Sequence, residues 1–251
     1  MRKYGLKLLL LAIVMALPYM STRDAHAVPT LQLYSEGAVY DFTTQSWMVY
    51  NNPFTLQVLG ADVPNQLNLV DEVKLHIAVP SEYFNPSGSV QISGVTSSLE
   101  GGSFGPLTFN ASSFTQGIPV ELAGWSGNAR THDIYHDAWY VSVPIENLQV
   151  NKTPSDTIIN YVDIAEGQLP AGTDTGDIDL YNITYSGFFL IHMDLTGMTR
   201  YARSSRDAME FAPFSHDADA PPPIPEPSTF ILLGLGITSL ALGSRRLGKR
   251  K

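Results

Sequence analysis

The clearest regular pattern in the chain is an alternation of apolar and polar residues between Val73 and Val79. Alternation with a period of two predicts a β-strand that buries one face. Similar runs recur along the middle of the chain, are rich in Val, Ile, Thr and aromatic residues, and lie between Gly, Pro, Asn, Asp and Ser clusters. These runs predict further strands at 30–34, 38–42, 46–50, 54–59, 90–95, 138–143, 178–185 and 188–195.

The spacing of these strands predicts an all-β domain over residues 28–220. About nine short strands in one domain favour an antiparallel β-sandwich or a jelly-roll-like arrangement. Residues 185–188 contain Gly187 and predict a hairpin turn between the last two strands. Residues 154–165 suit a short helix, and the Gly-, Ser- and Thr-rich stretch 97–128 predicts long loops.

The first 27 residues have the pattern of a secretory signal peptide. A basic start is followed by the apolar stretch 8–17, which is too short for a comfortable membrane span. Ala25 and Ala27 are small residues at the two positions that signal peptidase reads, which predicts cleavage before Val28. An uncleaved N-terminal anchor is the alternative.

The last 31 residues consist of three segments of different composition. A proline-rich linker at 221–227 precedes an uncharged apolar run at 230–243 and a basic tail at 245–251. As a helix the apolar run would extend about 21 Å, against a hydrocarbon core of about 30 Å. The basic tail keeps the C-terminus cytoplasmic by the positive-inside rule. Residues 228–251 therefore predict a short C-terminal transmembrane helix; an ordinary single-pass anchor is the alternative.

Three features of this segment resemble the PEP-CTERM sorting signal: the motif Pro225-Glu226-Pro227, the short apolar span, and the pair Arg245 and Arg246. The resemblance implies recognition by an exosortase, a membrane-embedded cysteine protease of Gram-negative bacteria that usually accompanies exopolysaccharide production. It also implies export, transient anchoring in the inner membrane, and a final place in the outer envelope, at the cell surface or outside the cell.

The domain between the two terminal segments has a resemblance of its own. Residues 28–33, 52–56 and 211–218 are similar to the choice-of-anchor N group, a family of exported bacterial proteins of unassigned biochemistry. The group implies a common outer domain joined to variable anchors. It supplies no catalytic residue that this chain could be matched to.

Charge and cysteine content restrict the partners of the predicted ectodomain. Nine of the 15 Lys and Arg lie in the terminal segments, whereas 22 of the 24 Asp and Glu lie within 28–220, which therefore carries a formal charge of −16. Nucleic acid and anionic membranes are poor partners for such a surface, whereas cations suit it. The chain has no cysteine, which excludes disulfides and a cysteine nucleophile.

Asp174, Asp177 and Asp179 form the main candidate metal site. Three carboxylates within six residues beside Gly176 predict a turn, and hard oxygen ligands on a turn suit Ca²⁺. The run lacks the full spacing of an EF-hand loop, so a solvated acidic turn is the competing interpretation.

His132 and His136 form the alternative metal site. On a helix, two histidines four residues apart share a face and suit Zn²⁺. The residue after His132 is Asp133 rather than the Glu of zinc proteases, and the flanking sequence is typical of a loop. A polar loop is therefore the main alternative.

Three other histidines are candidates for a metal site or a catalytic site. His76 and His192 lie on predicted strands and could meet if they share a sheet face. His216 and Asp217 follow the domain's last aromatic residues, where closure of the sandwich competes with a catalytic pair. Such a pair would need a serine nucleophile, and the chain has no Gly-x-Ser-x-Gly motif.

These observations favour a non-enzymatic, exported surface or matrix protein, processed by signal peptidase and an exosortase. A carbohydrate-binding module acting on exopolysaccharide is the second hypothesis, and it requires exposed aromatic residues arranged on one sheet face. A secreted hydrolase is the third, and it requires a cleft with converging carboxylates.

Overall fold

The computed structural model describes residues 28–62, 67–94, 105–120, 137–145, 147–151, 153–167, 173–201, 207–212 and 217–221. The predicted signal peptide, most of the proline-rich linker and the predicted C-terminal helix lie outside these ranges.

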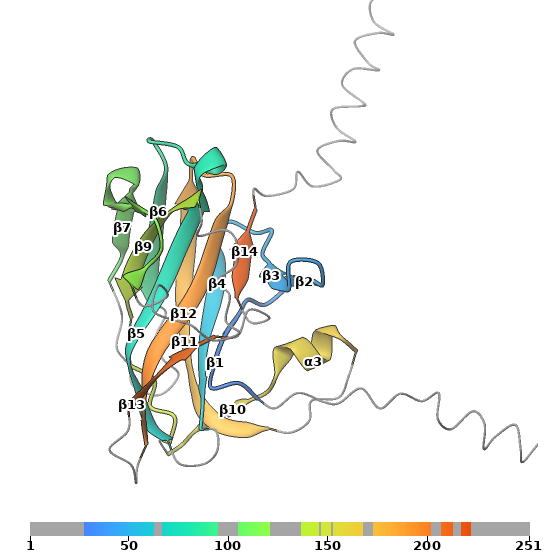
Figure 1. The fold of residues 1–251 in the computed structure, drawn as a ribbon. Helices are drawn as coiled ribbons and strands as arrows, with labels where there is room; N and C mark the ends of the chain where they lie inside the picture. The colour runs from blue at the N-terminus through green and yellow to red at the C-terminus, as the bar shows by residue number, and fades with distance from the viewer. Residues whose placement is uncertain are drawn as a thin grey trace, which may run out of the picture.

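Two β-sheets pack face to face in the described part of the chain, which confirms the predicted all-β sandwich (Figure 1). The first sheet contains β1 (Leu31–Tyr34), β4 (Phe54–Ala61), β11 (Asp174–Ser186), β6 (Ser89–Gly94) and β7 (Leu107–Asn110) in that order, with β10 (Asp156–Ile158) paired to β11. The second sheet contains β2 (Val39–Asp41), β3 (Ser46–Met48), β14 (Ala218–Ala220), β12 (Ile191–Tyr201), β5 (Leu67–Pro80), β9 (Ala138–Pro144) and β8 (Thr115–Gln116), with β13 (Asp207–Phe211) paired to β12.

The strand pairs are antiparallel apart from one among the described strands. β3 runs parallel to β14, with Trp47 opposite Ala218. This parallel pair joins a strand near the start of the domain to its last described strand.

The core lies between the two sheets and is built from alternate residues of each long strand. The predicted apolar face of β5 is confirmed, because Val73, Leu75, Ile77 and Val79 are at most 1% exposed. From the opposite sheet, Tyr181 and Ile183 of β11 join the same cluster. Each aliphatic side chain buried in this way contributes roughly 1.5–3 kcal/mol.

The predicted hairpin at residues 185–188 is wrong, although the chain does reverse there. Gly187 has a φ of +75°, a conformation that favours glycine, but the turn joins β11 of one sheet to β12 of the other. The two strands therefore face each other across the core and do not form a hydrogen-bonded pair. Alternation predicts a strand but does not say which sheet the strand joins.

The predicted helix over 154–165 is shorter than expected. Asp156–Ile158 forms β10, and the helix α3 contains Tyr161–Ala165. Asn160 precedes α3 and its side chain accepts a hydrogen bond from the Val162 backbone at 3.1 Å, which is the usual role of an N-cap residue. Two short 3₁₀ helices, η2 (Ser81–Tyr83) and η3 (Ala111–Ser113), complete the described helices.

The described chain ends directly after β14. The Tyr185 hydroxyl donates a hydrogen bond of 2.5 Å to the carbonyl oxygen of Pro221, which ties the beginning of the proline-rich linker to the sandwich. Within the described ranges, no helix has the length and apolar character needed to cross a membrane.

Candidate functional site

Polar residues interrupt the apolar pattern where β12 and β14 pair. On β12, Ile191 and Met193 are core residues, while His192 and Asp194 lie on the opposite face of the sheet. His192 stands opposite Asp219 of β14, and Ala218 stands opposite Met193. Because alternate residues share a face, Asp217 lies on the same face as Asp219, His192 and Asp194.

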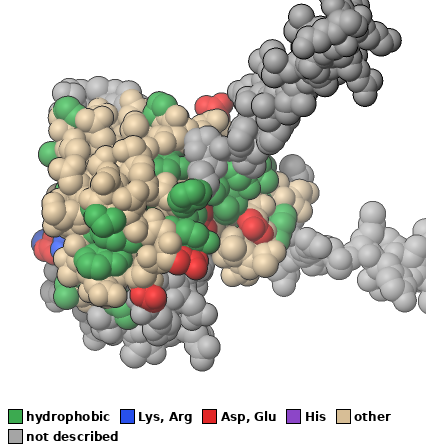
Figure 2. Space-filling view, turned by 90° about the horizontal axis from the view of Figure 1, so that it is seen from above, with side chains coloured by type: hydrophobic (Ala, Val, Ile, Leu, Met, Phe, Trp, Pro, Cys, Tyr) green, Lys and Arg blue, Asp and Glu red, His purple; other side chains and the backbone are tan. Residues whose placement is uncertain are grey.

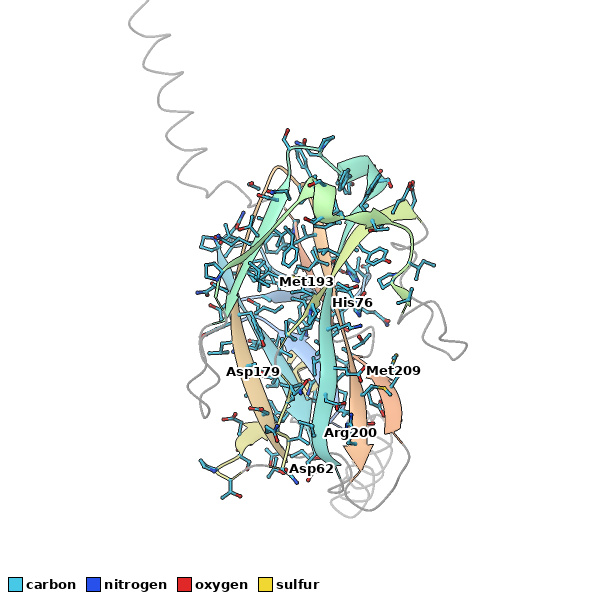
Figure 3. The ribbon with its side chains drawn as sticks, turned by 90° about the vertical axis from the view of Figure 1, so that its left-hand side faces the viewer. Asp62, His76, Asp179, Met193, Arg200 and Met209 are labelled. Atoms are coloured by element: carbon cyan, nitrogen blue, oxygen red, sulfur yellow. The ribbon has the colours of Figure 1, made fainter. Side chains whose placement is uncertain are left out.

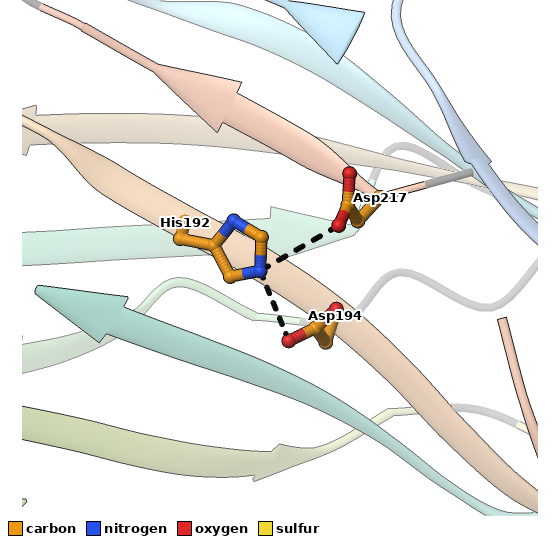
Figure 4. A group of neighbouring side chains, drawn as sticks. All are labelled: His192, Asp194 and Asp217. Carbon is orange, nitrogen blue, oxygen red and sulfur yellow. Dashed lines mark hydrogen bonds and ion pairs between the residues drawn. The ribbon is translucent and has the colours of Figure 1, made fainter. Parts of the chain in front are cut away.

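The side chains of Asp194 and Asp217 converge on the His192 ring (Figure 4). His192 Nε2 lies 3.1 Å from Asp194 Oδ2 and 3.7 Å from Asp217 Oδ2. On the other side of the ring, Nδ1 lies 2.7 Å from Asp219 Oδ1. Within the described part of the chain, His192, Asp194 and Asp217 are the set whose potential ligand atoms lie within 4.8 Å of one another.

This His192 cluster is closed to solvent even though it faces away from the main core. His192 is 2% exposed, Asp194 1% and Asp217 0%. Burial lowers the pKa of the imidazole, but the carboxylates of Asp194 and Asp219 outweigh that effect and hold the pKa of His192 well above 6.5. The carboxylates on both sides of the ring therefore favour its protonated form.

His76 lies on the same face, as the sequence had suggested, but it does not join the cluster. His76 stands opposite Asp194 in the β5–β12 register, and its own partners are hydroxyls. Nδ1 lies 2.9 Å from Ser142 Oγ and Nε2 lies 2.8 Å from Thr196 Oγ1. Each ring nitrogen of His76 thus contacts a hydroxyl, whereas each ring nitrogen of His192 contacts a carboxylate.

The turn predicted around Asp174, Asp177 and Asp179 is wrong, because these residues lie within the long strand β11. Asp177 and Asp179 point inward and are 2% and 3% exposed, whereas Asp174 has the opposite parity and lies on the other face. The outward orientation considered for Asp179 is therefore also wrong. Figure 3 shows Asp179 on the first sheet, apart from His76 on the second.

Asp177 has a structural partner within the sandwich. Its Oδ2 accepts a hydrogen bond of 2.8 Å from the backbone N–H of Gln149, and so fixes the segment that follows β9. Asp174 Oδ1 accepts a bond of 3.2 Å from the backbone N–H of Thr175. The calcium site stays a prediction, but the three aspartates do not share a face.

The other predicted site residues fall largely outside the described ranges. This holds for His132, His136 and His216, for Ala25 and Ala27 of the predicted cleavage site, and for the sorting residues Pro225, Glu226, Pro227, Arg245 and Arg246. Val28, the predicted first residue after cleavage, is the first described residue and is buried. Asp217, considered together with His216, lies beside His192 instead.

The sequence contained a signal for the His192 cluster that was not used. Two pairs of polar residues, His192 with Asp194 and Asp217 with Asp219, each alternate with apolar residues that belong to the core. Buried polar residues at alternate positions on two strands indicate a polar cluster if the strands are neighbours. Their separation of more than 20 residues hid that neighbourhood.

The described tryptophans are packed rather than arranged on an open face. Trp47 is 5% exposed and lies edge-on to Tyr34. Trp139 stacks on Phe84 with 4.5 Å between ring centroids. An exposed aromatic pair occurs elsewhere, where Tyr83 and Phe189 lie 6.5 Å apart and are 38% and 64% exposed. On the face shown in Figure 2, apolar side chains gather in separate patches near acidic ones.

Comparison with known proteins identifies the C-terminal segment. Residues 223–250 match the PEP-CTERM protein-sorting motif. No curated protein matches the chain, and the resemblance of residues 28–220 to the choice-of-anchor N group stays a prediction. The matched segment covers the proline-rich motif, the apolar run and the arginine pair, so the chain is an exported protein that carries a PEP-CTERM sorting motif and is a substrate for exosortase sorting.

Proposed function

We propose that this protein is a non-enzymatic component of the cell surface or extracellular matrix, where its β-sandwich has a structural or binding role associated with exopolysaccharide. The observation that carries the proposal is the sorting motif at residues 223–250. A segment of this kind directs an exported domain to the envelope and contains no chemistry of its own. The activity of the mature protein therefore depends on the sandwich.

The character of the His192 cluster supports a non-catalytic role. Its three converging side chains are at most 2% exposed, so a polymer or small substrate has no direct access to their reactive atoms. Catalytic groups must lie within hydrogen-bond reach of the substrate. A buried cluster on a sheet face suits stabilisation better than turnover.

The charge of the domain supports a place in a hydrated matrix. With a formal charge of −16 over residues 28–220, the sandwich repels copies of itself and anionic surfaces. We infer that it remains dispersed within a polysaccharide network and is held there by neutral sugars or by bridging cations.

Processing at both ends is tested by intact-mass analysis of protein recovered from an exosortase-positive host. We expect the loss of about 27 N-terminal residues, as the signal-peptide pattern predicts, and of the apolar tail. A chain in which Pro225, Glu226 and Pro227 are replaced by alanine should keep its tail. Mature wild-type protein that still contains residues 245–251 would contradict C-terminal cleavage.

The role in the matrix is tested by fractionation of biofilms from three strains: wild type, an exosortase deletion, and a strain that makes no exopolysaccharide. We expect the protein in the matrix fraction only of the wild type. In the exosortase deletion it should remain with the membrane, and without exopolysaccharide it should enter the culture medium. Equal matrix retention in all three strains would contradict the proposal.

Carbohydrate binding is a second candidate function, and the exposed pair Tyr83 and Phe189 favours it. Sugar rings pack against exposed aromatic faces. Tyr83 is the last residue of η2, Phe189 lies between β11 and β12, and their rings are close together. A Tyr83→Ala, Phe189→Ala double variant should lose retention on purified exopolysaccharide while its thermal unfolding midpoint is unchanged. A double variant of the exposed residues Val39 and Phe42 is the matched control.

A further inference from the structure

We propose that His192 Nε2, Asp194 Oδ2 and Asp217 Oδ2 bind one divalent transition-metal ion, for which Zn²⁺ is the best match, and that this ion joins β12 to β14. The proposal concerns a site within the sandwich and is independent of the sorting segment. It also extends beyond the structural role proposed above, because it assigns the domain a specific cofactor.

The distances within the cluster are those expected around a metal ion. Two ligands at about 2.0–2.1 Å from a tetrahedral ion lie about 3.3 Å from each other. Nε2 lies 3.1 Å from Asp194 Oδ2 and 3.7 Å from Asp217 Oδ2, on either side of that value. The potential ligand atoms of the three residues all lie within 4.8 Å of one another, which is close enough for one ion to contact all of them.

Asp219 supplies a second, separate observation, because it lies on the far side of the ring from the proposed ion. Histidines that bind metals usually donate the other ring N–H to a carboxylate, which fixes the tautomer and the ring orientation. Asp219 Oδ1 lies 2.7 Å from Nδ1 and is placed directly opposite His192 by the β12–β14 register. When Nδ1–H donates to Asp219, the Nε2 lone pair points toward Asp194 and Asp217.

His76 is an internal comparison, because it is equally buried on the same sheet face. Its two ring nitrogens contact the hydroxyls of Ser142 and Thr196, which are the partners expected for a structural histidine. His192 has carboxylates around both nitrogens. The difference lies in ligand chemistry and not in burial.

The ligand set favours Zn²⁺ over the alkaline-earth ions. Imidazole nitrogen suits Zn²⁺ and its neighbours in the transition series, whereas Ca²⁺ takes six to eight oxygen ligands at longer distances. One imidazole and two carboxylates neutralise a divalent ion. All three ligands have low exposure, so the ion would lie away from bulk solvent. A tetrahedral ion with these three ligands keeps its fourth position for a water molecule.

The test uses the full 251-residue chain, purified in detergent without a polyhistidine tag and stripped with a chelator. We expect one Zn²⁺ to bind per chain, the thermal unfolding midpoint to rise on binding, and Co²⁺ in the same site to give visible d–d absorption bands. Ca²⁺ and Mg²⁺ at the same concentration and ionic strength should not bind at this site. They should change the thermal unfolding midpoint no more than an equal amount of salt does.

Variants assign the site to individual residues. Asp217→Asn and His192→Gln should weaken Zn²⁺ binding at least about 100-fold, and Asp219→Asn about 10- to 100-fold, since outer partners typically have that effect. His76→Gln is the matched histidine control and Asp179→Asn the matched carboxylate control, and both should bind Zn²⁺ as the wild type does. Near-ultraviolet circular dichroism of each stripped chain establishes that the variant is folded.

A combined His132→Gln, His136→Gln variant separates this site from the alternative histidine pair. Retention of one Zn²⁺ by that variant, together with its loss in folded Asp217→Asn, would support the proposal. Absence of Zn²⁺ binding to the folded wild-type chain would overturn it, as would Zn²⁺ binding that is lost with His132 and His136 but kept in Asp217→Asn. The cluster would then be a buried network of one imidazolium and its carboxylates.

Discussion

Buried carboxylates occur on β11 and β12, which are consecutive in the sequence but belong to different sheets. The two groups of carboxylates differ in what surrounds them. On β11, Asp177 and Asp179 point between the sheets, and Asp177 accepts a hydrogen bond from a backbone N–H. On β12, Asp194 points away from the core and meets a histidine and a carboxylate from β14. Asp177 thus holds the backbone of a segment 28 residues away in the sequence, whereas Asp194 meets the side chains of His192 and of Asp217, which strand pairing brings beside it.

The largest effect should come from removing the centre of the His192 cluster. His192→Leu leaves the carboxylates of Asp194, Asp217 and Asp219 without the imidazolium they share, and removal of one member of a buried ionic group typically costs about 3–5 kcal/mol. Urea unfolding monitored by tryptophan fluorescence measures this loss. His76→Leu is the control and should cost less, because its partners are neutral hydroxyls.

A smaller loss is expected on β11. Asp177→Ala removes the acceptor for the Gln149 N–H, and an unsatisfied backbone donor costs about 1–3 kcal/mol. Asp177→Asn keeps a carbonyl oxygen in the same place and should retain most of the stability in the same urea experiment. If Asp177→Ala lowered the free energy of unfolding as much as His192→Leu does, the carboxylates of β11 and β12 would not differ in their contribution to stability.

The tyrosines of the core predict a third effect, which appears only in alkali. Burial raises the pKa of Tyr185 from 10.0 to about 12, and that of Tyr40 likewise. The folded state therefore favours the neutral phenol, so this contribution to stability is complete below about pH 10 and is lost as the pH rises toward about 12. Urea midpoints of wild type and Tyr185→Phe across this window measure it, and the variant should lose less stability between the two ends.

The smallest effect is expected from calcium at β11. Asp174 lies on the face opposite to Asp177 and Asp179, so these carboxylates cannot all reach one ion without a change in the strand. At constant ionic strength, Ca²⁺ should therefore leave the thermal unfolding midpoint unchanged in both wild type and Asp174→Asn. A shift that disappears in Asp174→Asn would show that the sequence-based calcium site is correct.

Much of the fold was predictable because the strands obey a local rule. The apolar face of β5 follows from four alternating residues. The predicted strand 73–79 covers the C-terminal half of the 14-residue strand Leu67–Pro80. The partner of each strand was not predictable in the same way. Residues 185–188 have the composition of a hairpin turn, yet β11 and β12 enter different sheets because their apolar faces pack against each other across the core.

The candidate site was less accessible from sequence than the fold. Asp174, Asp177 and Asp179 are visibly close together in the sequence. They lie in one strand, however, and alternate residues of a strand point to opposite faces, so Asp174 is separated from the other two. The sequence suggests His76 as the partner of His192 and His216 as the partner of Asp217, since nothing local indicates that β14 returns to pair with β12. The registers that join Asp219 to His192 are set by long-range packing of the apolar partners Ala218 and Met193.

The position of β14 determines how the protein would carry mechanical load. The sorting motif begins at residue 223, three residues after β14 ends at Ala220, so tension between a membrane-held tail and the domain reaches β14 before any other described strand. β14 is only three residues long, but it is held on one side by β12 and on the other by β3, and the backbone carbonyls of Asp217 and Asp219 accept bonds from Trp47 and Val49. The side chains of the same two aspartates contact His192, so the strand next to the tether is joined to β12 by side chains as well as by backbone pairing.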